Sequence, residues 1–164
     1  MLWLRALLFF VVAPGTVLGF VPYRILRRER PFDVAVDPAT ALRWLVGALL
    51  VSTGLAGLVW CFALFVRRGR GTPAPYDPPR ALVTAGPYAV SRNPMYVCLW
   101  LVLAGEVAAT GSGSLAAWAL AVVAANVLFV RLYEEPTLAR LFGREYEAYR
   151  ARVPRWLGWR RRVS

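Results

Sequence analysis

Long apolar stretches separated by short polar ones dominate the pattern of this chain. Four such stretches run over about residues 2–21, 41–66, 95–110 and 115–130. A helix needs roughly 20 apolar residues to cross a hydrocarbon core about 30 Å thick. The first two stretches meet that length, while each of the last two gives only ~24 Å of helix and must extend into flanking polar residues or thin the bilayer. The pattern predicts an all-α integral membrane protein with about four transmembrane helices, the last two forming a C-terminal helical hairpin.

The first apolar stretch admits a second interpretation. Arg5, an apolar run and a small-residue site near Gly19 also form the pattern of a signal peptide. The run is longer than the apolar core of a typical signal peptide, which favours a transmembrane helix. Residues 23–40 then predict a polar loop before the second span.

The longest polar connector, residues 67–94, is rich in Gly and Pro. Loops of this length without evident regular structure are usually functional or disordered. Within it Gly86-Pro87 is a turn signal, and Pro94 suits the first turn of a helix because its missing N–H is not needed there. We therefore expect a polar loop that feeds the third apolar helix at about Pro94.

Another polar segment follows the last apolar stretch. Glu134-Glu135-Pro136 predicts a break in the helix, with Pro136 starting a new one. Residues 136–152 combine an apolar stripe at helical spacing with an arginine-bearing face, which is typical of an amphipathic helix that lies on a membrane surface or folds back against the core. We expect this helix at the cytoplasmic face, followed by an interface anchor over residues 153–164. The whole chain, residues 1–164, is predicted to be a single membrane domain.

Composition and charge support a membrane protein. The chain of 164 residues is 59% hydrophobic with a mean hydropathy of +0.49 and a net charge of +11. All 20 basic residues are arginines that flank the apolar stretches, so positive-inside topology explains the charge better than nucleic acid does. Placing both termini inside puts 15 arginines on the inner side and 5 on the outer side. We therefore predict an inner-membrane protein with cytoplasmic termini, whose partner is the bilayer and not nucleic acid.

The residue types limit the possible chemistry. The chain has no histidine, which excludes Ser-His-Asp and Cys-His catalysis and every His-ligated metal site. Cys61 and Cys98 lie inside apolar stretches and are better interpreted as small buried hydrophobic residues than as a disulfide or a metal site. We accordingly expect no metal. Asn126, a polar residue within the last apolar stretch, is a candidate for substrate binding because polar groups in spans are usually functional.

Two polar blocks together resemble a known family. Residues 82–96, which include Arg92-Asn93-Pro94-Met95-Tyr96, are similar to the Arg-His/Asn-Pro-x-Tyr signature of the isoprenylcysteine carboxyl methyltransferase family. Phospholipid N-methyltransferases share much of that signature. The second block, residues 134–149 with Val153-Pro154-Arg155, resembles the C-terminal motif of the same family. The resemblance covers about residues 67–157.

The resemblance implies an integral-membrane methyltransferase that uses S-adenosyl-L-methionine at the cytoplasmic face. Its acceptor would be lipidic or a small amphiphile with a carboxylate, thiol or amine, reached from the bilayer. The family's cofactor contacts, carried onto this sequence within a cofactor loop at 67–94 and the second block, fall on Leu82, Val83, Tyr88, Asn93, Pro94, Met95, Tyr96 and Glu134.

Two departures from the family pattern bear on the substrate. Asn93 stands where eukaryotic members have His, and Val130 stands where the prenylcysteine enzymes carry a substrate Arg, with Arg131 one step off. We expect Arg131 to contact the substrate together with Asn126, and Arg131 and Glu135 to act in catalysis. Glu135 is the nearest candidate base for an amine acceptor.

The residue chemistry agrees with this resemblance. The carboxylate of Glu134 suits the ammonium of the cofactor, and the rings of Tyr88 and Tyr96 suit its sulfonium through cation–π attraction. Methyl transfer depends on alignment and desolvation more than on acid–base groups, so a chain without histidine can perform it.

Three alternatives stay open at this point. The tyrosines, glutamates and Arg131 also fit purely structural roles as interface anchors, helix-end charges and an inner-face marker. Membrane sterol reductases, which bind a nicotinamide cofactor, have a similar C-terminal half but are much longer. A non-enzymatic four-helix membrane protein is the third alternative.

Overall fold

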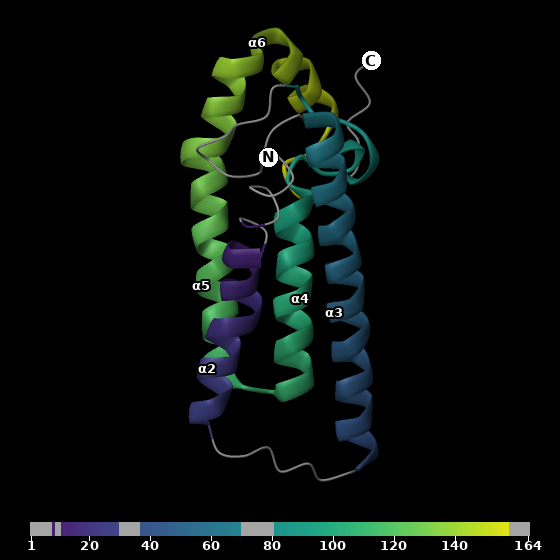
Figure 1. Ribbon diagram of the computed structural model, residues 1–164, viewed down its shortest axis with the longest axis vertical. Helices are drawn as coiled ribbons and strands as arrows, with labels where there is room; N and C mark the ends of the chain where they lie inside the picture. The colour runs from purple at the N-terminus through teal and green to yellow at the C-terminus, as the bar shows by residue number, and fades with distance from the viewer. Residues whose placement is uncertain (1–7, 9–10, 30–36, 70–80, 158–164) are drawn as a thin grey trace.

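All regular structure in the described part of the chain is helical. The computed structural model describes residues 8, 11–29, 37–69 and 81–157. Its elements are η1 (Thr16–Phe20), α2 (Val21–Arg28), α3 (Pro38–Leu64), η2 (Phe65–Gly69), η3 (Gly86–Ala89), α4 (Pro94–Thr110), α5 (Gly113–Phe129), η4 (Val130–Glu134) and α6 (Glu135–Arg152). The η elements are π-helical turns, except η3, which is a 3-10 turn. The helices lie side by side in an elongated bundle, over one end of which α6 bends (Figure 1).

The predicted apolar stretches coincide with helices. The stretches at 41–66, 95–110 and 115–130 fall on α3, α4 and α5. Two helical runs in the described residues, Pro38–Arg68 and Gly113–Arg152, are long and apolar enough to cross a membrane, and α4 is a shorter apolar helix. The expected all-α fold is thus confirmed for the described residues, whereas the number of spans stays a prediction. The stretch at 2–21 and the connector at 67–94 lie partly outside the described residues, as does the tail from 158.

The N-terminal helix is longer than the sequence predicted. It continues through α2 to Arg28, where a polar loop was expected from Tyr23. The turn η1 precedes Pro22, which has no N–H to offer to a carbonyl of the preceding turn. The indole Nε1 of Trp118 on α5 donates a 3.1 Å hydrogen bond to the Val17 carbonyl. This bond fastens the N-terminal helix to α5.

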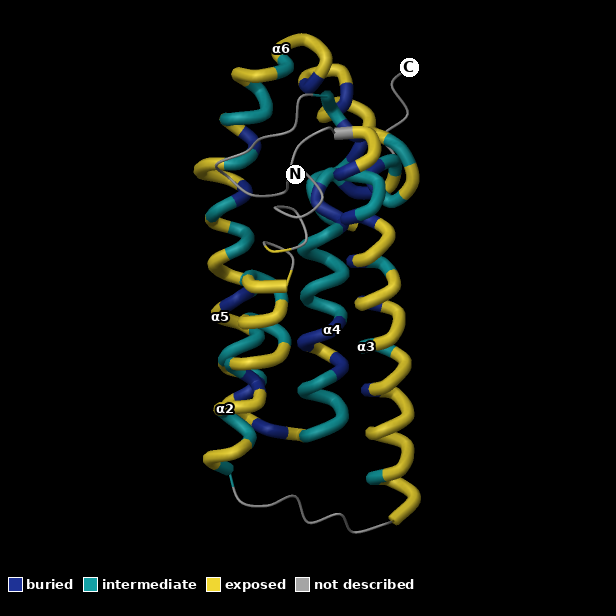
Figure 2. The backbone as a smooth tube through the Cα atoms, viewed as in Figure 1, coloured by how far each residue is buried: buried dark blue, intermediate teal, exposed yellow. Residues whose placement is uncertain are grey.

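Large apolar side chains face outward on the two longest helices. Leu42, Leu49 and Val59 on α3 and Leu120 on α5 are each 58% exposed or more. Figure 2 shows exposed residues along the outer face of α3 and buried ones on the side toward α4. An outward apolar face of this extent is the surface that a helix presents to lipid.

Close contact of α3 with α4 is made possible by glycine. A Cβ built on Gly54 would lie 2.8 Å from the Cys98 carbonyl oxygen, and one on Gly47 would lie 2.7 Å from the Gly105 carbonyl oxygen. Side chains at these positions would force the backbones apart. The close approach brings the end of α3 against the loop before α4, where Cys61, Val83 and Tyr88 form a buried cluster.

The helix does not break at Glu134-Glu135-Pro136, and that prediction was wrong. α5 continues through η4 into α6 (Figure 1). Pro136 lacks an N–H and would crowd the carbonyl one turn back in a regular α-helix. In the wider turn η4, the Glu135 N–H instead bonds to the Val130 carbonyl, five residues back. A π-helical turn of this kind accommodates the proline as a local kink and lets the helix continue.

The chain changes direction at Gly143 instead. Its φ of 47° and ψ of −120° lie outside the helical region and in a conformation that favours glycine. The segment predicted as one amphipathic helix is therefore two, and its second half turns back toward the bundle. Tyr146 and Tyr149 from this second half are buried and pack with Leu82 and Leu138. The tyrosines of the apolar stripe thus face the protein interior.

The first residues after α6 are fastened to the loop before α4, and most of the predicted interface anchor, from residue 158, lies outside the described residues. The Arg92 N–H donates to the Pro154 carbonyl at 2.9 Å. The Arg155 carbonyl accepts from Nδ2 of Asn93 at 2.9 Å and from the Ser91 hydroxyl at 3.3 Å. Val153 is buried, and these contacts tie residues 153–155 to the loop before α4.

A buried ion-pair cluster completes this attachment. The Glu135 carboxylate lies 2.7 Å from Nη1 of Arg92 and accepts two hydrogen bonds from Arg155, at 2.9 and 2.8 Å. The side chains of Arg92 and Glu135 are only 8% and 9% exposed. We call Glu135, Arg92 and Arg155 the clasp. It joins the loop before α4, the start of α6 and the segment after α6.

Replacing Gly54 by alanine should lower the melting temperature of the protein in detergent. Alanine is favoured over glycine in a helix by roughly 1 kcal/mol, but here its Cβ meets the α4 backbone. Gly15→Ala is the matched control, since a Cβ there meets nothing within 4 Å. An equal or higher melting temperature for Gly54→Ala than for the control would contradict the close α3–α4 approach.

Glu135→Gln should destabilise the fold by about 3–5 kcal/mol, because removing one partner of a buried ion pair leaves the other charge uncompensated. Denaturation of the purified protein, followed by circular dichroism, measures the change. Glu147→Gln is the control, since Glu147 pairs with Arg150 on the surface, where both side chains are about half exposed, and such pairs contribute about 0–1 kcal/mol. Similar effects of the two substitutions would refute the clasp.

Candidate functional site

A cavity of about 270 Å³ lies at the end of the bundle over which α6 bends. This is close to the lower end of the roughly 300–1,000 Å³ that pockets for small organic ligands span. The N-terminal helix, the ends of α3 and α5, the loop before α4 and α6 all contribute to its mostly apolar wall. Its lining residues are Ala13, Pro14, Val17, Leu58, Phe65, Leu82, Val83, Tyr88, Arg92, Asn93, Pro94, Met95, Tyr96, Leu99, Asn126, Phe129, Tyr133, Glu134, Thr137, Leu138, Leu141, Tyr146 and Tyr149.

Every residue expected at the cofactor lies in this lining. The eight positions come from two parts of the chain, the loop and first turn of α4 on one side and η4 on the other. Asn126, expected at the substrate, also lines the cavity. The structure shows that residues 38 positions apart in the chain, Tyr96 and Glu134, meet at one place.

The polar groups of the cavity consist of one carboxylate and several donors. The Tyr96 hydroxyl donates a 2.8 Å hydrogen bond to Oε2 of Glu134. In the described part of the chain, the Tyr88 hydroxyl and Nδ2 of Asn126 are buried without a hydrogen-bond partner. Burial raises the pKa of the Tyr88 hydroxyl well above its usual range, so this group stays protonated. The cavity therefore offers unused hydrogen-bond donors beside an acidic side chain.

The loop that carries half of the site is shaped by its local sequence. Gly86 adopts a φ of 62°, and Pro87 follows it in the short turn η3, which places Tyr88 in the interior. The Tyr149 hydroxyl donates a 2.7 Å hydrogen bond to the Tyr88 carbonyl. The Tyr88 ring packs against Phe65, with 6.4 Å between the ring centroids. The turn is thus fixed from η2 on one side and from α6 on the other.

Asn93 fastens the segment after α6 in addition to lining the cavity. It is 5% exposed and stands immediately before α4, and its Nδ2 donates to the Arg155 carbonyl. Its backbone N–H donates to the Ser91 hydroxyl at 3.1 Å. The amide side chain therefore has a structural partner that the sequence did not reveal.

The two residues expected to act in catalysis lie elsewhere. Glu135 is buried in the clasp with both oxygens bound, and its hydrogen bonds raise the pKa of the Arg155 guanidinium. Arg131 is exposed on η4. Neither lines the cavity. The structure thus brings together the cofactor positions and Asn126, and it separates them from Arg131 and Glu135.

Several lining residues were not expected from the sequence. Tyr146 and Tyr149 were assigned only to the apolar stripe of the last helix, and Arg92 was passed over within the signature. All three residues lie in the two motif blocks, which was a usable signal. Ala13, Pro14 and Val17 have no such signal, because only the packing of the N-terminal helix against α5 brings them to the cavity.

The two cysteines are not among the residues that line the cavity. Cys61 and Cys98 are free thiols, and Cys61 is buried against Val83 and Tyr88. In the ranges that the structure describes, no group of three or more His, Cys, Asp or Glu side chains could hold a metal ion.

Comparisons with known proteins bear on the identity of the chain. The family model described as phospholipid methyltransferase matches residues 42–145. The chain is also 35% identical, over 109 residues, to the nickel-cobalt-cadmium resistance protein NccN of Alcaligenes xylosoxydans xylosoxydans. That alignment covers 66% of this chain but only 46% of the relative. No solved structure matches the chain. The family match extends over more than half of the chain, from α3 into α6, and the chain therefore belongs to the phospholipid methyltransferase family.

Proposed function

We propose that this chain is an S-adenosyl-L-methionine-dependent methyltransferase that acts on a lipidic or small amphiphilic acceptor at the cytoplasmic face of the inner membrane. Family membership implies a membrane methyltransferase. The observation that carries the finer proposal is the cavity. All eight residues at which the resemblance places cofactor contacts line it, although they come from separate parts of the chain.

The residues of the cavity fit the chemistry of the methyl donor. A zwitterionic amino-acid end needs a carboxylate for its ammonium, and Glu134 supplies one that Tyr96 holds in place. The aromatic faces of Tyr88 and Tyr96 suit a sulfonium or a flat adenine. The buried Tyr88 hydroxyl and the Asn126 amide have donors left for the polar edges of a ligand. The apolar wall around them suits the adenine ring.

The protein's own contribution would be alignment and exclusion of water. S-adenosyl-L-methionine, when bound, supplies an electrophilic methyl group on sulfur. In-line displacement at that carbon is promoted by holding the acceptor in line and removing solvent. Tyr146 and Tyr149, turned over the cavity by the bend at Gly143, cover it from the side of α6. The site thus needs no histidine.

The apolar part of the lining favours an acceptor from the bilayer. Val17 of the N-terminal helix and Phe129 at the end of α5 line the cavity, and so does Leu141, which is 51% exposed. Since Leu141 both lines the cavity and reaches the surface, an acyl chain could enter beside it. Both oxygens of Glu135 are bound by arginines, so this residue is not placed to act as a base. This favours an acceptor that is nucleophilic without first losing a proton. Arg131 is exposed and fits the role of a positive charge that marks the cytoplasmic side of the membrane.

The ligand that the protein binds distinguishes the proposed methyltransferase from two other functions. A reductase-like relative would bind a nicotinamide cofactor, and a non-enzymatic membrane protein would bind neither ligand. The chain spans less than half of the length of the nickel-cobalt-cadmium resistance protein NccN.

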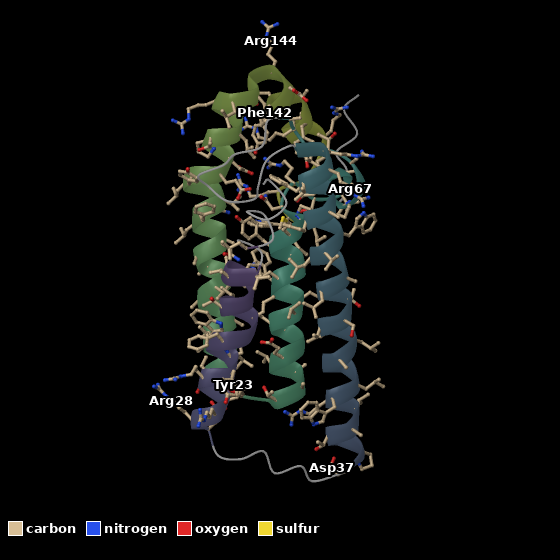
Figure 3. The ribbon with its side chains drawn as sticks, viewed as in Figure 1. Tyr23, Arg28, Asp37, Arg67, Phe142 and Arg144 are labelled. Atoms are coloured by element: carbon tan, nitrogen blue, oxygen red, sulfur yellow. The ribbon has the colours of Figure 1, made fainter. Side chains whose placement is uncertain are left out.

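We further propose that both termini lie in the cytoplasm and that four helices span the membrane. Arg67 and Arg144 lie at the end of the bundle that carries the cavity, and Arg28 and Asp37 lie at the opposite end (Figure 3). The excess of arginines at the cavity end supports its cytoplasmic location.

Glu134→Gln should weaken binding of S-adenosylhomocysteine more than tenfold. Removing one partner of a buried charged pair costs about 2–5 kcal/mol, at ~1.4 kcal/mol per tenfold in affinity. Isothermal titration calorimetry of the detergent-purified protein measures the change. Glu145→Gln, an exposed carboxylate on α6, is the charge-matched control and should bind like wild type. NADPH, titrated in parallel, should not bind.

Equal affinity of the folded Glu134→Gln protein and wild type would remove Glu134 from the cofactor site. Binding of NADPH but not of S-adenosylhomocysteine would favour the reductase alternative. Binding of neither ligand by folded wild-type protein would favour the non-enzymatic one.

Cysteine labelling tests the topology. In a Cys61→Ala/Cys98→Ala background, Ser114→Cys in the first turn of α5 should react with a membrane-impermeant maleimide in intact cells. Glu145→Cys on α6 should react only after the membrane is opened. Both positions are exposed in the fold, so access depends on the side of the membrane. The reverse pattern would invert the orientation.

A further inference from the structure

A second pocket, of about 350 Å³, lies beside the cavity on the far side of Arg92. Arg92 lines both, but the second pocket is otherwise built from the end of α6 and the segment after it. Its lining residues are Arg92, Arg150, Ala151, Arg152, Val153, Pro154 and Arg155. Four of these seven residues carry a guanidinium group, whereas the wall of the cavity is mostly apolar.

The charges at this pocket are not balanced by the carboxylates that contact it. Glu135 is shared by Arg92 and Arg155, and Glu147 pairs with Arg150 at 2.9 Å. Arg152 donates its Nε to the Ala148 carbonyl and has no carboxylate partner among the described ion pairs. Four guanidinium groups therefore face two carboxylates, and the pocket keeps a positive surplus.

The groups of this pocket that lack a hydrogen-bond partner are donors. The Nε of Arg92 is buried without a partner in the described residues. The carbonyls of Pro154 and Arg155 already accept hydrogen bonds from the loop before α4. Since a guanidinium has five N–H donors and no acceptor, a ligand here must supply acceptor oxygens. The pocket is therefore suited to an anion and not to a cation.

We propose that this pocket binds a phosphate group, either that of an anionic membrane lipid or free phosphate. The planar fork of a guanidinium matches a phosphate bidentately, and four arginines line this pocket. The pocket lies at the arginine-rich end of the bundle, where an anionic leaflet would supply lipid phosphates. The proposal does not depend on the methyl-donor site, because the anion is held by a different set of residues and Arg92 is the only one in common.

An Arg150→Gln/Arg152→Gln double variant tests this site without disturbing the clasp. The control is Arg140→Gln/Arg144→Gln, which removes the same charge from two exposed arginines of α6 outside the pocket. In detergent at constant ionic strength, inorganic phosphate is titrated while the melting temperature is recorded. In nanodiscs, the fraction of phosphatidylglycerol in phosphatidylcholine is varied with the same readout.

Wild type and the control should be stabilised saturably by at least one of the two probes, and the pocket variant should need at least tenfold more of that probe. A response to phosphatidylglycerol alone identifies a lipid headgroup as the ligand, a response to inorganic phosphate alone identifies the free anion, and a response to both shows that the phosphate group itself is recognised. Equal responses of the pocket variant and the control, or no response of wild type to either probe, would overturn the proposal.

Discussion

The carboxylate of Glu135 lies buried between the guanidinium groups of Arg92 and Arg155, and the shape of the site depends on this contact. Burial of a carboxylate is costly unless it is paired and hydrogen-bonded, and here each of its oxygens is bound. Because the three residues come from the loop before α4, the start of α6 and the segment after α6, their pairing fixes those segments relative to one another. The cavity is lined in part by the first two of these segments, so the clasp helps to hold its shape.

Glu134 and Glu135 are neighbours with different surroundings. On a helix, successive side chains point about 100° apart, so one carboxylate reaches the cavity while the next enters the clasp. The helix must continue through Pro136 for this separation to exist, and the π-helical turn η4 makes that possible. The bend then falls at Gly143, which brings Tyr146 and Tyr149 over the cavity. Backbone geometry thus places the first glutamate at the cavity and the second in the clasp.

Features that depend on local sequence patterns were predictable, whereas contacts between residues far apart in the chain were not. Helix α4 begins at Pro94 as its turn signal indicates, and the two motif blocks led to all eight expected cavity residues. The clasp has no periodicity that a sequence reveals, since Arg92 lies in a distant loop and Arg155 reaches Glu135 only after the chain turns at Gly143. The proline at 136 was misread because its missing N–H can end a helix or widen one turn. Arg131 was placed by its distance along the chain, but its position on η4 turns it outward.

Hydrogen–deuterium exchange with and without S-adenosylhomocysteine tests most directly whether the cavity holds the methyl donor. Binding should slow exchange in two separate peptides, one covering residues 82–96 and one covering residues 130–149, since both line the cavity. Exchange at residues 112–120, at the far end of the bundle, should not change. Protection at the far end alone, or no protection in either cavity peptide under saturating ligand, would contradict the assignment of the cavity as the donor site.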